Sequence, residues 1–135
     1  MNYKERMIDT ATTIIAEMYN APENQLRKVG SRKRHIMEAR RLLIFYLNKF
    51  IGVKHLHMKQ YIDGLCHATS IHHCKKMEFF LVTERGVAEE YNEFLLRMRE
   101  FDIFNEVIKD KQQRVIELQA EINTYFKTKK NGSTN

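Results

Sequence analysis

The most apolar segment of the chain reads Ala39-Arg40-Arg41-Leu42-Leu43-Ile44-Phe45-Tyr46-Leu47-Asn48-Lys49-Phe50-Ile51-Gly52. Its apolar side chains recur at intervals of three and four residues, which is the spacing of one buried face of an α-helix. Gly52 follows directly, as a helix C-cap does. The longest unbroken apolar run, from Leu42 to Leu47, has six residues, far fewer than the roughly 20 that span a bilayer. We therefore expect a core helix here and no membrane insertion.

Helical periodicity extends over most of the remaining chain. Apolar residues recur at helical spacing from Ile8 to Tyr19, and Pro22 is well placed in the first turn of a short helix that ends near Leu26. A turn at Asp63-Gly64 separates a short helix from a longer one, which Gly86 terminates. We expect helices at about 8–19, 22–26, 39–51, 55–62, 67–84 and 87–126.

The composition supports this helical reading. The 135 residues include one Pro and five Gly, with 43% hydrophobic and 30% charged residues, which favours an all-α helical bundle over a turn-rich β protein. Two cysteines provide no disulfide framework, so we expect a cytoplasmic protein. The P-loop, the GxSxG elbow and the dinucleotide fingerprint do not occur. We therefore expect no enzyme and no cofactor.

The positive charge is concentrated in one block. Residues 26–76 contain twelve basic and two acidic side chains, whereas the segments on either side are both slightly acidic. A concentrated positive field suits a polyanion, because each neutralised phosphate releases counterions. This pattern favours double-stranded DNA as the partner. The alternative is a helical interaction or scaffold protein whose basic block binds RNA or an acidic protein.

The block contains the layout of a helix-turn-helix. A short helix and a Gly-containing turn precede a longer helix, whose N-terminal residues would face base edges in the major groove. His67, Thr69, Ser70 and His73 supply hydrogen-bonding groups there. Lys75 and Lys76 follow one to two turns later, where they would reach phosphates.

Cysteine and histidine cluster in this longer helix, which raises the alternative of a zinc site. Zinc sites usually take pairs of ligands from two elements. On one helix, residues 67, 71, 74 and 78 share a face, and that set includes Ile71 and Glu78, so the ligands do not converge. We expect no metal site. We interpret Cys74 as a small buried hydrophobe, on a buried face formed with Ile71, Met77 and Leu81.

Several segments of the chain resemble the C-terminal, DNA-box-binding domain of the bacterial replication initiator DnaA. The stretch His67-Ala68-Thr69-Ser70-Ile71-His72-His73-Cys74-Lys75-Lys76-Met77 is similar to the signature D-H-T-T-V-L-H-A-C-R-K-I, with Cys66 at its first position. Ser31-Arg32-Lys33-Arg34 followed by Ala39-Arg40 is similar to S-K-R-R-x-x-x-x-A-R. Residues 15–19 and 87–94 resemble the opening and closing helices of that domain, so the resemblance covers roughly residues 8–99 and leaves no room for the initiator's ATPase part.

The resemblance implies a role for each motif. It places Arg34, with Arg32 and Lys33, in the minor groove, and Arg40 on a phosphate. It assigns base reading in the major groove to His67 and Thr69. Two signature positions differ, because Cys66 replaces Asp and Ala68 replaces Thr. The resemblance therefore does not predict which DNA sequence this chain prefers. A stand-alone domain of this kind would suit a transcription or replication accessory factor of a bacterium, a phage or a mobile element.

A heptad pattern occupies the end of the chain. After a DNA-binding domain at 1–99, residues 100–126 carry apolar a and d positions, with Lys111 as a polar d residue and Tyr125 as the last d residue. We expect a homodimer through this helix, with its orientation open. The alternative is that the helix folds back on residues 8–19 or 39–51. Residues 127–135 are expected to be a disordered tail. The predicted oligomerisation residues are Phe101, Phe104, Ile108, Val115, Leu118 and Ile122.

Overall fold

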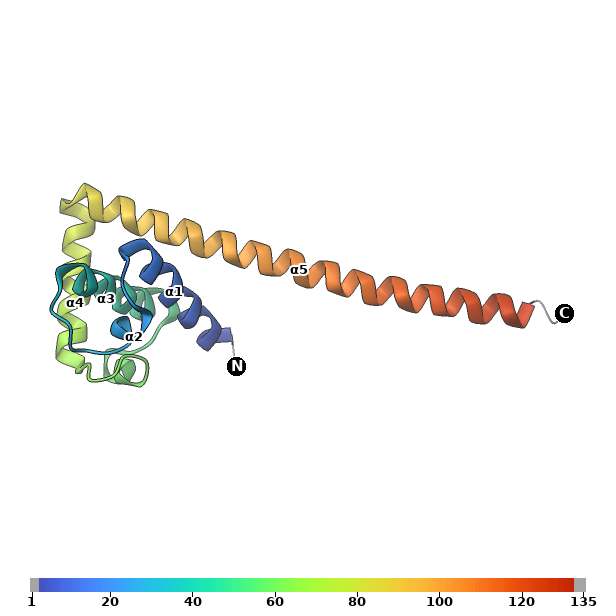
Figure 1. The fold of residues 1–135 in the computed structure, drawn as a ribbon, viewed down its shortest axis with the longest axis horizontal. Helices are drawn as coiled ribbons and strands as arrows, with labels where there is room; N and C mark the ends of the chain where they lie inside the picture. The colour runs from blue at the N-terminus through green and yellow to red at the C-terminus, as the bar shows by residue number, and fades with distance from the viewer. Residues whose placement is uncertain (1–2, 133–135) are drawn as a thin grey trace. The chain divides into compact units, whose positions relative to one another are not determined.

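The computed structural model describes the backbone of residues 3–132, with side chains for residues 3–101 and 109–127. The described chain is all-α, which confirms the predicted fold class (Figure 1). Its elements are α1 (Tyr3–Tyr19), α2 (Glu23–Leu26), α3 (Arg34–Tyr46), the π-helical turn η1 (Leu47–Ile51), the 3-10 helix η2 (His55–Gln60), α4 (His67–Thr83) and α5 (Arg85–Gly132).

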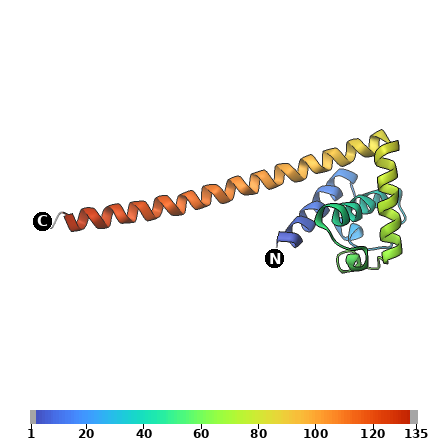
Figure 2. The same ribbon diagram turned by 180° about the vertical axis from the view of Figure 1, so that it is seen from behind.

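The chain divides into two compact units, Met1–Met98 and Arg99–Asn135. In the first, α3 contacts α1, α2 and α4 and lies between α1 and α4 in both ribbon views (Figure 1 and Figure 2). The second unit consists of the helical residues of α5 beyond Met98.

The core of the first unit is built around α3. Leu42, Leu43 and Ile44 are at most 1% exposed, and burying each such side chain contributes about 1.5–3 kcal/mol. The ring of Tyr46 meets that of Phe94 edge to face, with 5.0 Å between the ring centroids. The apolar segment of residues 39–52 is therefore the centre of the unit, and the beginning of α5 packs on it.

Several predicted boundaries shift in the structure. The helix expected from residue 39 already begins at Arg34, and Gly52 ends it with a left-handed φ of 88°, as a C-cap glycine does. Gly86 does not end α4, because Glu84 alone separates α4 from α5. The predicted disordered tail from Lys127 is wrong over residues 127–132, which continue α5. These residues contain no Pro, so nothing breaks the helix before Gly132. Residues 133–135 lie outside the described chain.

Candidate nucleic-acid interface

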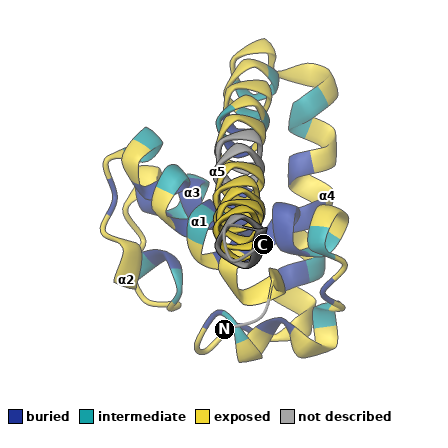
Figure 3. Ribbon diagram, turned by 90° about the vertical axis from the view of Figure 1, so that its right-hand side faces the viewer, coloured by how far each residue is buried: buried dark blue, intermediate teal, exposed yellow. Residues whose placement is uncertain are grey.

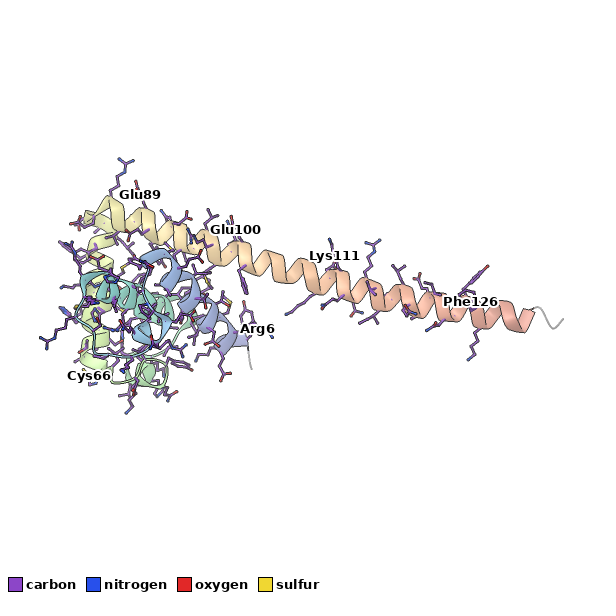
Figure 4. All side chains as sticks on the ribbon, viewed as in Figure 1. Arg6, Cys66, Glu89, Glu100, Lys111 and Phe126 are labelled. Atoms are coloured by element: carbon purple, nitrogen blue, oxygen red, sulfur yellow. The ribbon has the colours of Figure 1, made fainter. Side chains whose placement is uncertain are left out.

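A short helix, a turn and a long helix follow one another in the basic block. The 3-10 helix η2 ends at Gln60, and α4 begins at His67. Gly64, in the turn between them, has a φ of 79°, a left-handed conformation that glycine adopts without strain. This order of elements is that of a helix-turn-helix. Cys66 is the N-cap residue of α4 and lies at the solvent-exposed end of this helix (Figure 4).

The basic loop, residues 29–33, is joined to this turn by backbone hydrogen bonds. The Val29 N–H donates to the Asp63 carbonyl, and the Asp63 N–H donates to the Arg27 carbonyl, both at 2.8 Å. The Arg27 Nε donates to the Tyr61 carbonyl at 2.6 Å. The beginning of the loop is therefore fixed beside the N-terminal end of α4, although more than thirty residues separate them in the sequence.

The other end of the loop lies beside the C-terminal half of α4. A cleft of about 600 Å³ is lined by Arg32 and Arg34 and, from α4, by Met77 and Phe80. Arg41 also lines it, and its guanidinium lies over the Phe80 ring at 5.2 Å from the centroid. The loop thus runs along α4 from one end toward the other.

Arg40 is not placed to contact a phosphate. Its side chain is only 5% exposed, and its guanidinium donates to the Gln25 carbonyl at 2.7 Å and to the Ser31 carbonyl at 3.5 Å. Burial lowers the pKa of this guanidinium. The prediction for Arg40 is therefore corrected. The residue links the backbone of α2, through Gln25, and of the basic loop, through Ser31, to α3. Carbonyl groups satisfy part of this buried cation, while its Nε has no hydrogen-bond partner among the described residues.

Ser70 and His73 are likewise interior residues. Ser70 is fully buried, and its hydroxyl is hydrogen-bonded to His55 Nδ1 at 2.7 Å. His73 is 9% exposed, and burial is the main reason that its pKa falls to about 4, so its ring is neutral at pH 7. Both predicted DNA contacts are therefore wrong. The buried face of α4 is centred on Ser70, His73, Cys74 and Met77, whereas Ile71 and Leu81 are only half-buried. Buried, intermediate and exposed stretches alternate along α4 in Figure 3.

The other predicted contact residues are exposed. The loop presents Arg32 and Lys33, and Arg34 follows as the first residue of α3. The outer side of α4 presents His67, Thr69, Lys75 and Lys76. Arg34 forms an ion pair with Glu38, at 3.0 Å between Nε and Oε1. Within the described chain, Arg32, Lys33, Lys75 and Lys76 form no ion pair, so their charge is available to an anionic partner.

Sequence reasoning missed two members of this surface. His72 is exposed on α4, four residues after Ala68 and four before Lys76. This spacing was a usable signal, because residues four apart share a helix face. Arg41 is the second, and its stacking on Phe80 comes from a residue on another helix, so no local pattern reveals it.

The cysteines and histidines of α4 do not gather into a cluster of potential metal ligands. Nowhere among the described side chains do three or more His, Cys, Asp or Glu residues come together as ligands. Burial raises the pKa of the Cys74 thiol to about 11, as expected for an unreactive core cysteine. Cys66 is exposed, and its hydrogen bond with the Thr69 hydroxyl, at 3.0 Å between Sγ and Oγ1, lowers the pKa of its thiol.

Comparison with known proteins gives the chain no family. No protein-family model matches it, and a search of curated proteins finds no match. No helix in the described part of the chain is both long and apolar enough to cross a bilayer.

Proposed function

We propose that the chain is a double-stranded DNA-binding protein that uses α4 and the basic loop together. The N-terminal half of α4 enters the major groove, and the loop enters the neighbouring minor groove. The observation that carries this proposal is the backbone pairing of Val29 with Asp63, which fixes the cationic loop beside the end of α4. A helix and an adjacent basic arm are what is needed to bind two neighbouring grooves at once.

The charges on this surface support a phosphate-bearing partner. Lys75 and Lys76 lie on the exposed side of α4, while Arg32 and Lys33 extend from the loop. A narrow minor groove attracts arginine through its negative potential. Phosphate and minor-groove contacts of this kind supply affinity for any duplex, and base contacts supply the sequence preference.

Base reading falls to the exposed polar residues of the first two turns of α4. His67, Thr69 and His72 are accessible there, and imidazole and hydroxyl groups both hydrogen-bond to base edges in the major groove. Ala68 offers a methyl group for contact with thymine. The resemblance to the replication initiator's DNA-box-binding domain agrees with this assignment, and supports a role as a transcription or replication accessory factor.

Fluorescence anisotropy with labelled random duplex tests the proposal. We expect binding at about 50 mM salt that weakens steeply with added salt, because counterions are released. The double variant Arg32→Ala/Lys33→Ala should flatten the slope of log K against log salt by about two units, one for each lost contact. Lys109→Ala, which removes one cation from the second unit, should leave the slope unchanged.

Two results would overturn the proposal. One is the absence of duplex binding at about 50 mM salt, where phosphate contacts are strongest. The other is tighter binding of double-stranded or single-stranded RNA than of duplex DNA in a competition assay, which would favour the RNA-binding scaffold. Selection from a random duplex pool then gives the preferred sequence.

A further inference from the structure

The second unit carries an exposed apolar stripe. Every described residue from 109 to 127 is exposed. Val115, Leu118 and Ile122 follow one another at spacings of three and four, and are 62%, 49% and 48% exposed. Tyr125 continues the stripe at 60%. Burying a Val, Leu or Ile side chain contributes about 1.5–3 kcal/mol, so this stripe favours association with a second helix that has a matching stripe.

We propose that two copies of this chain associate through residues 101–132 as an antiparallel coiled coil. Its twofold axis passes between Ile116 and Glu117, so that Val115 packs on the partner's Leu118. The partner is a second copy because the seam is self-complementary in its apolar pattern and in its charge.

Lys111 decides the orientation. It occupies a d position of the seam, with Val115 at the following a position. A parallel dimer would place it beside the partner's Lys111, and two like charges next to one another in a seam destabilise it. In the antiparallel dimer an a residue faces a d residue, so Lys111 lies beside the partner's Ile122. Its methylene chain covers that side chain, and its ammonium group reaches water.

Arg114 and Glu121 decide the register. Both occupy g positions, and g faces g across an antiparallel seam. With the axis between Ile116 and Glu117, Arg114 faces the partner's Glu121, and symmetry repeats this ion pair. A shift of one heptad places Arg114 against the partner's Arg114 in one direction, or Glu121 against the partner's Glu121 in the other. Neither residue forms an ion pair within the described chain.

The same register gives the longest overlap. It places Phe101 opposite the partner's Gly132, and Gly132 is the last residue of α5. The paired segment therefore spans nearly the whole second unit, Arg99–Asn135. Its length is about 48 Å at 1.5 Å per residue. Charge pairing and helix length, which are independent of each other, thus select one arrangement.

Sedimentation equilibrium of full-length charge variants tests this arrangement. The wild-type chain should sediment at about twice its 16.2 kDa mass. Arg114→Glu and Glu121→Arg should each weaken self-association about tenfold, because two attractive pairs become repulsive. An equimolar mixture of these two variants should restore wild-type dimerisation, since every facing pair in the mixed dimer is then attractive. Lys109→Glu and Glu117→Arg make matched charge changes outside the seam and should have no effect.

Three outcomes would overturn the proposal. The first is a monomeric wild-type chain at tens of micromolar. The second is wild-type association of both single variants, because in a parallel dimer Arg114 would face the partner's Gln119 and the substitutions would remove no ion pair. The third is weak association that mixing does not restore, because Arg114 and Glu121 would then not face one another across the seam. Circular dichroism confirms that each variant remains helical. These measurements contain no nucleic acid. They therefore test the antiparallel dimer independently of the proposed DNA-binding function.

Discussion

Helix α4 and the second half of α5 show opposite relations between sequence pattern and burial. The buried face of α4 includes the polar side chains of Ser70 and His73, whereas apolar Val115 and Ile122 of α5 are about half exposed or more. α4 packs against α3 and η2, which bury one of its faces. No such neighbour buries a described residue beyond 108. A helix face becomes a core only where another element covers it, whatever its own apolar content.

The largest change in stability should come from truncating a buried leucine of α3, and the same truncation in α5 provides the comparison. Leu43→Ala removes a fully buried side chain from α3 and should lower the free energy of unfolding by about 2–5 kcal/mol in urea titrations. Leu118→Ala is the matched truncation in α5. It should leave the unfolding of the first unit unchanged and weaken only self-association. Equal destabilisation of the first unit by both variants would mean that α5 beyond residue 98 belongs to its core.

The buried histidine of α4 makes the first unit sensitive to pH. Because the pKa of His73 is about 4 in the folded chain and about 6.5 when unfolded, the unfolded state binds more protons in the interval between them. Stability is therefore complete above pH 6.5 and falls as the pH drops toward 4, by on the order of 3 kcal/mol. The pKa of His55 is lowered too and adds in the same direction. Chemical denaturation at pH 7 and pH 4.5 measures the loss.

A substitution separates the His73 contribution from general acid effects. His73→Gln keeps a polar side chain of similar size and does not titrate, so most of the pH dependence should disappear. A pH dependence identical to that of the wild-type chain would show that the ring of His73 is not shielded from protonation.

We expect Arg40 to contribute to the stability of the fold and Arg32 to contribute to duplex binding. Arg40→Ala removes the hydrogen bonds to the Gln25 and Ser31 carbonyls, and should cost about 1–3 kcal/mol of stability because these part-buried carbonyls lose their donors. Arg32→Ala, on the exposed loop, should leave thermal unfolding unchanged and weaken duplex binding. If Arg40→Ala unfolded like the wild-type chain while losing DNA binding, Arg40 would be a phosphate contact after all.

The smallest changes are expected in duplex affinity, for substitutions of Thr69 and Lys75 on the outer side of α4. Thr69→Ala should narrow the gap between preferred and random duplex by about 1–3 kcal/mol, the value of a base contact. Lys75→Ala should weaken both duplexes equally and flatten the salt slope by about one unit. Anisotropy titrations at several salt concentrations measure both quantities. Equal losses on both duplexes for Thr69→Ala would remove it from the base-reading surface.

Much of the fold follows from local patterns in the sequence. The spacing of apolar residues around Leu42–Leu47 predicted the central helix, and Gly52 was correctly expected to end it. The concentration of cations in residues 26–76 predicted where an anionic partner would bind, which stays a prediction. The side chains of Phe104 and Ile108, which were expected in the seam, lie outside the described residues, whereas Phe101 is exposed.

The sequence by itself determined which segments are helical and where their apolar side chains recur, because both depend on residues three and four positions apart. Only the tertiary structure decided that Ser70 and His73 face inward, that Arg40 holds the loop, and that Val29 pairs with Asp63. Ser70, Arg40 and Val29 each have a hydrogen-bond partner from a distant part of the chain, namely the His55 ring, the Gln25 carbonyl and the Asp63 carbonyl. His73 is buried although its Nδ1 has no hydrogen-bond partner in the described part of the chain, because the packing of α4 against α3 and η2 covers that face. Most buried polar groups need such a partner, and periodicity within one helix carries no information about a partner or a covering element from elsewhere in the chain.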